Sequence, residues 1–600
     1  MANERKTENI VRNHFNKFSD NCQIEEQSSS TPKIDKLLRT ASKKGSGKGY
    51  PEFIVSLTDN QEFIIVIECK GDTKYHESMN HGKYAEYAVD GVLLYASYLS
   101  KDYDVLAIAV SGQNLKELKV SHYLCLRGSS KPATIFGDKL LPLENYLDGY
   151  IHSPEKFRQD YDSLLAFSRE LNQELHSNKI LENQRGLLIS SILIALENKA
   201  FRKSYKDHDK PEDLANALVD TVSNELKRAN IQPKRLENLG VQFSFIRTDT
   251  TLSGEKNILS KLIDDIDTNV NRFIKTHEYF DVLGQLYIEF LRYANSDKRL
   301  GIVLTPAHVT ELFCDLAGVN KNSVVYDNCA GTGGFLISAM SKMIKNAKGD
   351  LTKEKQIKEF QIIGVEYQAH IFALACSNMF IHQDGKANII PGSCFDEKII
   401  KEVREYHPNI GFLNPPYKTE KTDPHELEFM LNNLEALESG GTCIAIVPME
   451  RVLATSGKKF ELKKRLLEKN TLEAVMSMPD QLFINSGTGT VTAIIVVTAH
   501  KPHPKNKETY FGYWKNDGFV IRKNRGRIDA YGRWADIKAE WLDSFINRRN
   551  KIGLSVNKIV TAKDEWCAEA YMETDYSKLN EKDFVRDLKK YVMFKKLELE

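Results

Sequence analysis

Four consecutive residues, Asn414-Pro415-Pro416-Tyr417, carry the sharpest chemical signal in the sequence. They follow an apolar run, 410–413, so we expect them at the end of a strand. Two prolines fix the backbone and remove two N–H donors, which leaves the Asn414 side-chain oxygen and the Pro415 carbonyl as acceptors. Two acceptors suit an exocyclic amine, and the Tyr417 ring offers a flat face on which an unstacked base can lie. The motif predicts chemistry on a nucleobase amino group.

A glycine-rich turn lies upstream of this motif. The apolar run 324–326 leads into Asp327, and the glycines are followed by residues that favour a helix. Glycines let the backbone approach a ligand closely, and the first amides of a helix attract negative charge. We therefore expect a nucleotide-like ligand here. The candidate binding residues are Asp327, Ala330, Gly331, Thr332, Gly333 and Gly334.

Two further carboxylates stand at expected strand ends in the same region. Glu366 ends the run 361–365, where a carboxylate can accept hydrogen bonds from both hydroxyls of a ribose. Asp396 follows the strand-like run 389–390 and could accept from an adenine amino group. Together with the glycine turn and Asn414, these acids indicate a binding site for a nucleoside cofactor. They make it less plausible that Asn414 merely belongs to an ordinary proline turn after a strand.

A second constellation lies near the N-terminus. Glu52 precedes one strand-like run, and Glu68 and Lys70 end another, 61–70. Glu68 and Lys70 point to the same side because strand side chains alternate. Glu52 and Glu68 could jointly hold Mg²⁺, and Lys70 could orient or help deprotonate a water that attacks phosphorus. Taken alone, the three charges would also fit a solvated strand face.

The composition indicates the class of protein to which both sites belong. Apolar residues make up 41% and charged residues 28% of the 600 residues, as in a globular protein with several domains. Lys plus Arg number 83 against 82 Asp plus Glu, a formal net charge of +1. Any nucleic-acid surface must therefore be a local basic patch.

The cysteines and the apolar runs predict a cytoplasmic location. The nine cysteines contain no CxxC pair, so we expect them to be reduced residues of the core that neither form disulfides nor bind zinc. The N-terminus lacks the apolar stretch of a signal peptide, and no run of about eighteen uncharged apolar residues occurs. We expect no contact with a membrane.

Periodicity divides the chain into four predicted parts. Residues 1–150 alternate helix and strand patterns and predict a mixed sheet, whereas apolar residues recur at helical spacing through 151–295. In 296–500, short apolar runs alternate with helix-length segments, which predicts a doubly wound, largely parallel sheet. The Lys-rich and aromatic segment 501–600 is expected to be mostly helical toward its end. The fold class is therefore α/β and multidomain.

From about residue 155 to 500 the sequence resembles the N6-adenine DNA methyltransferases, especially the methylation subunits of type I restriction systems. In that family a Thr-Pro segment before the glycine turn closes over the methionine end of the cofactor, and Thr305-Pro306 matches it. Asp327-Asn328 stands where the family usually has Asp-Pro. The resemblance implies S-adenosylmethionine as cofactor, with Asp327 near its amino group. An RNA or a protein glutamine is the rival substrate.

The N-terminal pattern resembles the PD-(D/E)xK nuclease superfamily, with Pro51-Glu52 as a glutamate variant of its first acid. A helix acid often completes that site. Glu8 is a candidate for it, and Glu25 and Glu26 compete. Two nearby residues could confuse the metal assignment but are expected to be ordinary loop residues, namely Asp72 and His76.

The nuclease-like part, the helical connector and the methyltransferase together resemble the combined restriction-modification subunits of type IIB and IIG enzymes, especially the BcgI A-subunit kind. The resemblance implies methylation and Mg²⁺-dependent cleavage of double-stranded DNA. About 100 residues follow residue 497, too few for a full recognition domain, so we expect a separate specificity subunit and a hetero-oligomer. The alternative is a methyltransferase whose N-terminal part binds DNA or a partner without cutting.

Overall fold

The chain, described here from a computed structural model, divides into two compact units, Met1–Asp162 and Ser163–Glu600. Each unit has its own hydrophobic core. No helix among the described residues is long and apolar enough to cross a bilayer. The structure describes residues 3–58, 60–129, 131–229, 231–254, 257–277, 280–292, 303–382, 388–418, 420–486, 489–522, 526–573 and 580–597.

A six-stranded mixed sheet forms the first unit, as the sequence predicts for this part of the chain. Its strands lie in the order β1-β2-β3-β4-β5-β6, with β3 and β4 parallel and the other neighbours antiparallel. The strands are β1 (Cys22–Glu25), β2 (Phe53–Leu57), β3 (Phe63–Lys70), β4 (Asp104–Ser111), β5 (Lys119–Cys125) and β6 (Ala133–Thr134).

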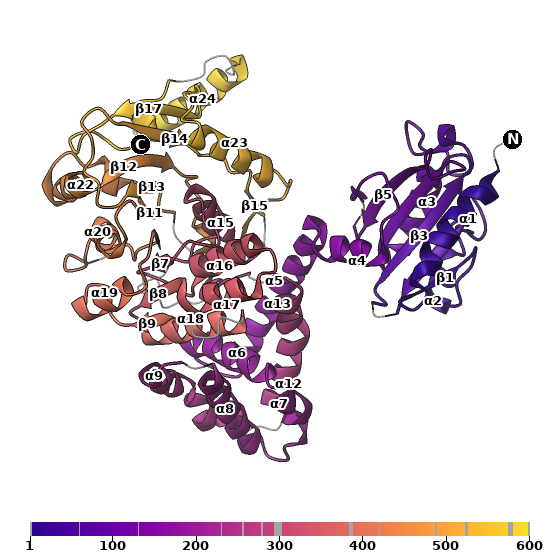
Figure 1. Ribbon diagram of the computed structural model, residues 1–600, viewed down its shortest axis with the longest axis horizontal. Coiled ribbons are helices and arrows are strands. Elements are labelled where there is room, and N and C mark those ends of the chain that lie inside the picture. Colours follow the sequence, from indigo (N-terminus) through magenta and orange to yellow (C-terminus); the bar gives the residue numbers. More distant parts are fainter. Residues whose placement is uncertain are drawn as a thin grey trace. The chain divides into compact units, whose positions relative to one another are not determined.

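Helices cover both faces of this sheet (Figure 1). Helices α1 and α4 pack against Phe63 and the other odd-numbered core residues of β3, whereas α2 and α3 pack against Ile64. Because strand side chains alternate, Glu68 and Lys70 lie on the α3 side of β3. The helices are α1 (Glu4–Phe15), η1 (Asn16–Phe18), α2 (Pro32–Leu38), η2 (Thr73–Tyr75), α3 (Ala88–Leu99) and α4 (Leu143–Ile151).

Helices α5 to α14 form the helical region that the sequence predicts. Within it, α6 (Glu182–Leu196) is buried on nearly every side, and it packs against α8, α14 and also α18, a helix of the adjoining sheet (Figure 1). This region therefore shares one compact unit with that sheet. The remaining helices are α5 (Pro154–Ser177), α7 (Lys199–Ser204), η3 (Tyr205–Asp207), α8 (Pro211–Arg228), α9 (Pro233–Phe243), α10 (Phe245–Thr248), α11 (Thr250–Gly254), α12 (Ile258–Ile266), η4 (Asp267–Asn271), α13 (Arg272–Thr276) and α14 (Val282–Arg292).

A nine-stranded sheet organises the rest of the second unit, in the order β17-β14-β12-β13-β11-β10-β7-β8-β9. Strands β9, β8, β7, β10 and β11 run parallel, and β13 is antiparallel to both of its neighbours. Chain order reverses between β7 and β10, the place where open parallel sheets bind ligands. The doubly wound, largely parallel prediction is confirmed.

The elements of this part alternate along the chain. Its strands are β7 (Val325–Asp327), β8 (Ile362–Glu366), β9 (Ile389–Pro391), β10 (Ile410–Leu413), β11 (Thr442–Pro448), β12 (Thr471–Ser477) and β13 (Thr492–Thr498). Its helices are α15 (Ala307–Leu316), α16 (Gly334–Ala347), α17 (Leu351–Phe360), α18 (Ala369–Ile381), α19 (Glu397–Arg404), α20 (Glu426–Ala436), α21 (Glu450–Leu453), α22 (Gly457–Lys469) and η5 (Ile484–Ser486).

The prediction of helix toward the end of the segment after residue 500 is confirmed by α24, but the segment also contains strands that the sequence did not predict. Strand β14 (Glu508–Tyr513) pairs with β12, and β17 (Ser555–Ile559) pairs with β14, so this segment completes the nine-stranded sheet. Pairing with an existing strand outweighs weak local preference in such short, polar strands. The other elements are β15 (Val520–Arg522), β16 (Gly526–Ile528), α23 (Trp534–Ile546), η6 (Ala568–Ala570) and α24 (Glu581–Leu597).

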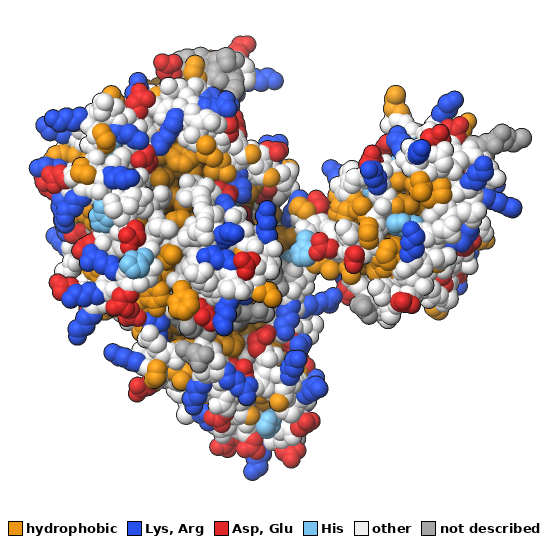
Figure 2. Space-filling view, in the orientation of Figure 1, with side chains coloured by type: hydrophobic (Ala, Val, Ile, Leu, Met, Phe, Trp, Pro, Cys, Tyr) orange, Lys and Arg blue, Asp and Glu red, His pale blue; other side chains and the backbone are white. Residues whose placement is uncertain are grey.

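Charges of both signs are spread over the surface. Figure 2 shows basic and acidic side chains interspersed on the face in view, in keeping with the formal net charge of +1. Long-range attraction to a polyanion therefore has to come from the local arrangement of charges rather than from the total.

Candidate active sites

The predicted cofactor and catalytic residues meet at the carboxyl end of the second unit's sheet. Asp327 ends β7, Glu366 ends β8, and Asn414 directly follows β10. Strand β7 is paired with both β8 and β10, with Asp327 opposite Gly364 and Phe412. The three side chains, far apart in sequence, are therefore brought to one edge of the sheet at its switch point.

The glycine turn has the backbone geometry that its sequence requires. Gly331 has φ +54° and Gly333 has φ +90°, conformations that other residues rarely adopt, and Gly333 caps α16. The Gly331 N–H donates to Glu366 Oε2 at 3.0 Å, and the Gln368 N–H donates to Oε1 at 2.8 Å. Burial raises the pKa of Glu366 to about 6, although these N–H groups oppose the rise. Glu366, at the end of β8, is thus hydrogen-bonded to the glycine turn through Gly331.

Asp327 presents a buried acceptor at the same turn. Its Oδ1 accepts from the Cys329 N–H at 2.9 Å, whereas its Oδ2 has no hydrogen-bond partner among the described residues. Burial, with a smaller contribution from the charge of Glu366, raises the pKa of Asp327 to about 8. A buried carboxylate oxygen without a donor favours a ligand that brings one, such as an ammonium group. The residue therefore fits the amino end of the expected cofactor.

Asn328, the departure from the family's usual proline, has a specific role in this fold. Its buried Nδ2 donates to the Phe429 carbonyl and to Asn432 Oδ1, each at 2.9 Å. Asn433 Nδ2 in turn donates to Asn328 Oδ1 at 3.3 Å. A proline could make none of these bonds, so the amide ties the start of the glycine turn to α20.

The Asn414 side chain is oriented by two acceptors. Its Nδ2 donates to the Val303 carbonyl at 2.7 Å and to Thr305 Oγ1 at 3.0 Å. Because a carbonyl can only accept, the amide nitrogen must face Val303, and the amide oxygen must face away. That oxygen is buried and has no hydrogen-bond partner within the described parts of the chain. The neighbouring Pro415 is also buried.

Tyr417 stands beside this amide with its ring packed edge-on. Its ring centroid lies 6.3 Å from that of Phe483, at an interplanar angle of 88°. Its hydroxyl is buried with no partner in the described residues, and burial raises its pKa well above the usual value. The Phe483 contact was not predicted from the sequence.

Glu426, which the sequence did not single out, holds the loop that carries Tyr417. Its Oε1 accepts from the Lys418 N–H at 2.9 Å, and its Oε2 pairs with Arg451 Nε at 2.6 Å. Glu426 is fully buried at the start of α20. No local sequence signal distinguishes such an acid from an ordinary exposed one at a helix start.

Thr305 and Pro306 lie just before α15, and Pro306 caps that helix. The contact between Thr305 and Asn414 shows that this segment orients the Asn414 amide and also adjoins the glycine turn, where Leu304 lies against Gly331. Further along α15, His308 lies 3.2 Å from Asp517 and stacks on Phe519. The C-terminal segment therefore packs directly on the helix that follows the Thr-Pro segment.

Asp396 has a different local role from the other predicted acids. It is exposed, and its side chain caps α19 by accepting from the Lys398 N–H at 2.9 Å. A helix-capping role accounts for an acid at this position by itself. The adenine contact stays a prediction.

In the first unit, Glu68 and Lys70 come together at the end of β3. Glu68 is fully buried, and its Oε1 forms ion pairs with Lys43 and, at 3.5 Å, with Lys70. Its Oε2 has no hydrogen-bond partner in the part of the chain that the structure describes. Lys70 also contacts Glu4 Oε1 at 2.5 Å. Neither Lys43 nor Glu4 was singled out from the sequence.

Glu52 belongs to the same electrostatic group. Its pKa is raised to about 7, first by burial and then by the charge of Glu68, while Lys43 and Lys70 pull it down. Two carboxylates near one another and partly removed from water favour a bound cation. Glu52 and Glu68 therefore fit a Mg²⁺ ion, although no group of three or more His, Cys, Asp or Glu side chains converges on a metal position among the residues described.

The candidates for the helix acid of the nuclease site, and the two nearby loop residues, differ in their surroundings. Glu8 contributes to raising the pKa of Glu52, which places its charge nearby. Glu26 pairs with Arg12 at 2.6 Å, and Glu25 accepts from Ser29 Oγ and the Ser30 N–H. The two loop residues have local contacts, with His76 between Ser111 and Ser121 and Asp72 capping η2.

Comparison with known proteins identifies the family. The N-6 DNA Methylase family model matches residues 278–599. The type II restriction enzyme and methyltransferase RM.BcgI of Heyndrickxia coagulans is 30% identical over 99% of this chain and 97% of its own length. The type I restriction enzyme MpnII methylase subunit of Mycoplasma pneumoniae is 27% identical over 54% of this chain and 64% of its own length.

Among solved structures, the type I restriction-modification methyltransferase subunit from Streptococcus thermophilus is similar, with a TM-score of 0.48 and 16% identity over 70% of this chain and 100% of that one. The family match and the near full-length relative agree with the motifs at the sheet edge. The chain belongs to the N-6 DNA methylase family and is a BcgI-like restriction-modification protein with a type I-like methyltransferase.

Proposed function

We propose that Asn414, Pro415 and Tyr417 form the catalytic centre of this N6 DNA methyltransferase. The observation that carries the proposal is the buried Asn414 Oδ1, which lacks a partner among the described residues while its amide nitrogen donates to Val303 and Thr305. An acceptor fixed in this way suits an N–H donor brought by the substrate.

The chain's residues then hold the adenine for direct displacement. Asn414 Oδ1 and the Pro415 carbonyl accept hydrogen bonds from the N6 amino group, which draws the nitrogen lone pair out of conjugation with the ring. The Tyr417 ring stacks on the base once it has left the duplex. S-Adenosylmethionine, when bound, supplies an electrophilic methyl group on sulfur. Most of the rate comes from this positioning, with no covalent enzyme intermediate.

The proposed binding site for the cofactor lies at the same edge of the sheet. Asp327 Oδ2 suits the methionine amino group, and the Glu366 carboxylate, which stands at the same sheet edge, suits the ribose hydroxyls. Thr305-Pro306 borders the methionine end, and Asp396 is the candidate for the adenine amino group. The turn itself contributes Ala330, Gly331, Thr332, Gly333 and Gly334.

Two variants test the catalytic assignment. Asn414→Ala and Tyr417→Ala should each abolish transfer of a labelled methyl group to DNA while S-adenosylhomocysteine still binds. Asn409→Ala is a matched control, because Asn409 lies before the same strand and bonds the Val324 N–H instead. Retained methylation by Asn414→Ala would overturn the assignment. Label on RNA or on a protein glutamine, with none on DNA, would favour the rival substrates.

We also infer a nuclease site in the first unit, formed by Glu52, Glu68 and Lys70. The buried Glu68 Oε2 without a described partner and the raised pKa of Glu52 support a shared Mg²⁺ ion. Lys70, 3.5 Å from Glu68 Oε1, would orient or help deprotonate the attacking water. The relative from Heyndrickxia coagulans is named both a restriction enzyme and a methyltransferase.

Cleavage of unmodified DNA tests this site. Glu52→Gln, Glu68→Gln and Lys70→Ala should each abolish Mg²⁺-dependent cutting and leave methyl transfer intact. Glu26→Gln serves as the control, because this acid pairs with Arg12 on the same unit. If Glu68→Gln still cuts DNA, the site lies elsewhere. If the wild-type protein with its partner does not cut cognate DNA, the first unit is a binding domain.

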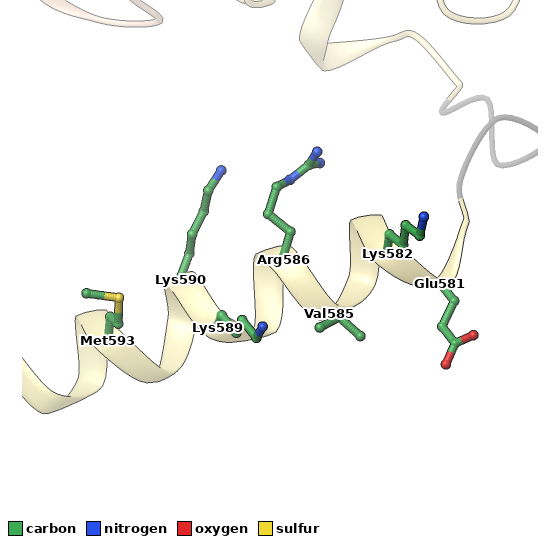
Figure 3. Close-up of a pocket in the computed structure, with 7 residues that line it drawn as sticks. All are labelled: Glu581, Lys582, Val585, Arg586, Lys589, Lys590 and Met593. Atoms are coloured by element: carbon green, nitrogen blue, oxygen red, sulfur yellow. The ribbon is translucent and has the colours of Figure 1, made fainter.

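We further propose that DNA specificity comes from a separate subunit and that α24 is one of its docking elements. This helix exposes apolar side chains at helical spacing, and Figure 3 shows Val585 and Met593 on it beside basic residues. A large exposed apolar stripe on a helix is typical of a helix–helix interface. The exposed apolar residues are Phe584, Val585, Leu588, Tyr591, Val592 and Met593.

Co-purification tests the docking proposal. The chain should form a stable complex with a specificity-type subunit of a restriction-modification system from the same organism, measured as mass by light scattering. Replacing Leu588 and Tyr591 by Glu should dissociate the complex, whereas replacing the exposed Lys590 of the same helix by Glu should not. An intact complex after the first change would exclude α24 as a docking element.

A further inference from the structure

Asp281, from the helical region, contacts the glycine turn of the methyltransferase. Its Oδ2 accepts from Thr332 Oγ1 at 3.1 Å, and Thr332 lies within the turn. Its Oδ1 accepts from Asn378 Nδ2 at 2.6 Å and from the Gly284 N–H at 2.8 Å. One carboxylate therefore joins the start of α14, the helix α18 and the cofactor turn.

The groups around this carboxylate form a tight polar cluster. Thr332 and Asn378 are each 1% exposed, and Asn378 Nδ2 also donates to the Thr332 carbonyl at 3.0 Å. Burial raises the pKa of Asp281, while the three donors oppose the rise. Groups held in such a cluster lose hydrogen bonds that water cannot restore when one member is removed.

The last glycine of the turn leaves room for this contact. A Cβ atom added at Gly334 would lie 3.0 Å from Asp281 Oδ2, closer than real side chains normally pack. Gly334 is also the first residue of α16. The helical region thus places a carboxylate at the start of the helix that the cofactor turn opens.

We propose that Asp281 is a positioning residue, which fixes Thr332 and the glycine turn so that the cofactor finds a preformed site. The proposal rests on the assignment of that turn to S-adenosylmethionine. It gives the helical region a part in cofactor binding rather than a connecting role only. Asp281 acts through hydrogen bonds to Thr332 and Asn378 and not through its charge.

Hydrogen bonding and charge can be separated at this position. Asparagine keeps an oxygen for the Gly284 and Asn378 donors, and its NH₂ group can donate to Thr332 Oγ1, which then acts as acceptor. Alanine removes every one of these bonds. Thr332→Val removes the hydroxyl that bonds Asp281, while it keeps the shape of the side chain and the bond from Asn378 to the Thr332 carbonyl.

The test measures S-adenosylhomocysteine binding by calorimetry on the full chain, with steady-state KM and kcat for methyl transfer. D281A and T332V should weaken binding and raise the KM for S-adenosylmethionine by about tenfold, with kcat changed by less than about threefold. D281N should recover most of the affinity. D249A is the matched control, because Asp249 caps α11 through the Thr251 and Leu252 N–H groups. It should lower the unfolding temperature and leave affinity unchanged.

If D281A and T332V both bind S-adenosylhomocysteine as tightly as the wild type, the positioning role of Asp281 is overturned. The assignment of the turn to the cofactor would then still stand. Equal losses in D281N and D281A would show that the charge of Asp281 acts on the ligand directly, which also contradicts the proposal. T332V retains the carboxylate, so it tests the contact even if D281A fails to fold. A wild-type chain that does not bind the ligand would instead refute the assignment of the turn.

Discussion

Thr305 Oγ1 accepts a hydrogen bond from Asn414 Nδ2 at 3.0 Å. This bond joins the segment before α15 to the proposed catalytic motif after β10, across 109 positions of sequence. Because it engages the amide nitrogen, it helps to leave the amide oxygen of Asn414 free for the proposed contact with the substrate. We therefore expect the Thr-Pro segment to affect methyl transfer as well as cofactor binding.

Thr305→Val should lower the rate of methyl transfer more than it weakens DNA binding. The change removes one of the two acceptors of the Asn414 amide nitrogen, and a lost hydrogen bond of this kind costs about 1 kcal/mol, or roughly a fivefold fall in kcat. Thr310→Val on α15 is the control, because its hydroxyl bonds Ala307 and Ser338 instead. An unchanged kcat in the Thr305 variant would show that the bond does not orient the amide.

Cofactor affinity should rise with pH towards about pH 8, because the pKa of Asp327 is about 8. Below that pH the carboxyl of the free protein is protonated, and binding of a cationic amino group must release the proton. Above it the carboxylate is already ionised, so affinity should level off. Calorimetry with S-adenosylhomocysteine between about pH 6.5 and 8.5, in buffers of different ionisation enthalpy, measures both effects.

The matched variant for this pH dependence is Asp327→Asn, which cannot titrate. It should bind more weakly and lose the dependence near pH 8, while the contribution of Glu366, with its pKa of about 6, should persist at lower pH. If the wild-type affinity is flat across this range, or falls as the pH rises, Asp327 does not contact the cofactor's amino group.

Glu426→Ala should destabilise the second unit and slow methyl transfer. It removes the buried partner of Arg451, which among the described residues keeps only its pair with the exposed Glu450, and it removes the acceptor of the Lys418 N–H. Breaking a buried ion pair costs about 3 kcal/mol or more. Denaturant unfolding measures the loss. The control is Glu435→Ala on the same helix, which breaks an exposed pair with Arg404 and should cost about 1 kcal/mol or less.

Lys43→Ala should shift DNA cleavage to higher pH. Lys43 lowers the pKa of Glu52 and Glu68, so its removal lets both values rise further above the ordinary range of a carboxyl group. Mg²⁺ needs the ionised carboxylates, and the midpoint of the pH–rate profile at limiting Mg²⁺ should follow. Lys48→Ala is the control, since Lys48 pairs with Asp35. A shift to lower pH would contradict the proposed metal site.

Local motifs made the position of the candidate methyltransferase residues in the fold largely predictable. Asp327, Glu366 and Asn414 each end or follow an apolar run, and parallel strands bring their carboxyl ends to one edge of a sheet. The positive φ angles at Gly331 and Gly333 likewise follow from residue type. These features depend on short stretches of sequence and on general rules of sheet topology.

The contacts that orient those motifs could not be predicted in the same way. Asp281 meets Thr332 across 51 positions, and Lys43 meets Glu68 across 25. A buried acid and a solvated acid look identical in sequence when the partner lies on another element. Strand β14 was missed for a related reason, because pairing with β12 rather than local preference determines its conformation.

The protection of DNA by its own methyltransferase tests the central claim most directly. DNA is incubated with S-adenosylmethionine and either the wild-type or the Asn414→Ala protein, in each case with the proposed specificity subunit. The DNA is then purified, sequenced for N6-methyladenine and treated with the wild-type complex and Mg²⁺. DNA treated with the wild-type complex should carry N6-methyladenine and resist cutting, whereas DNA treated with Asn414→Ala should be unmodified and be cut. N6-methyladenine deposited by Asn414→Ala would contradict the account.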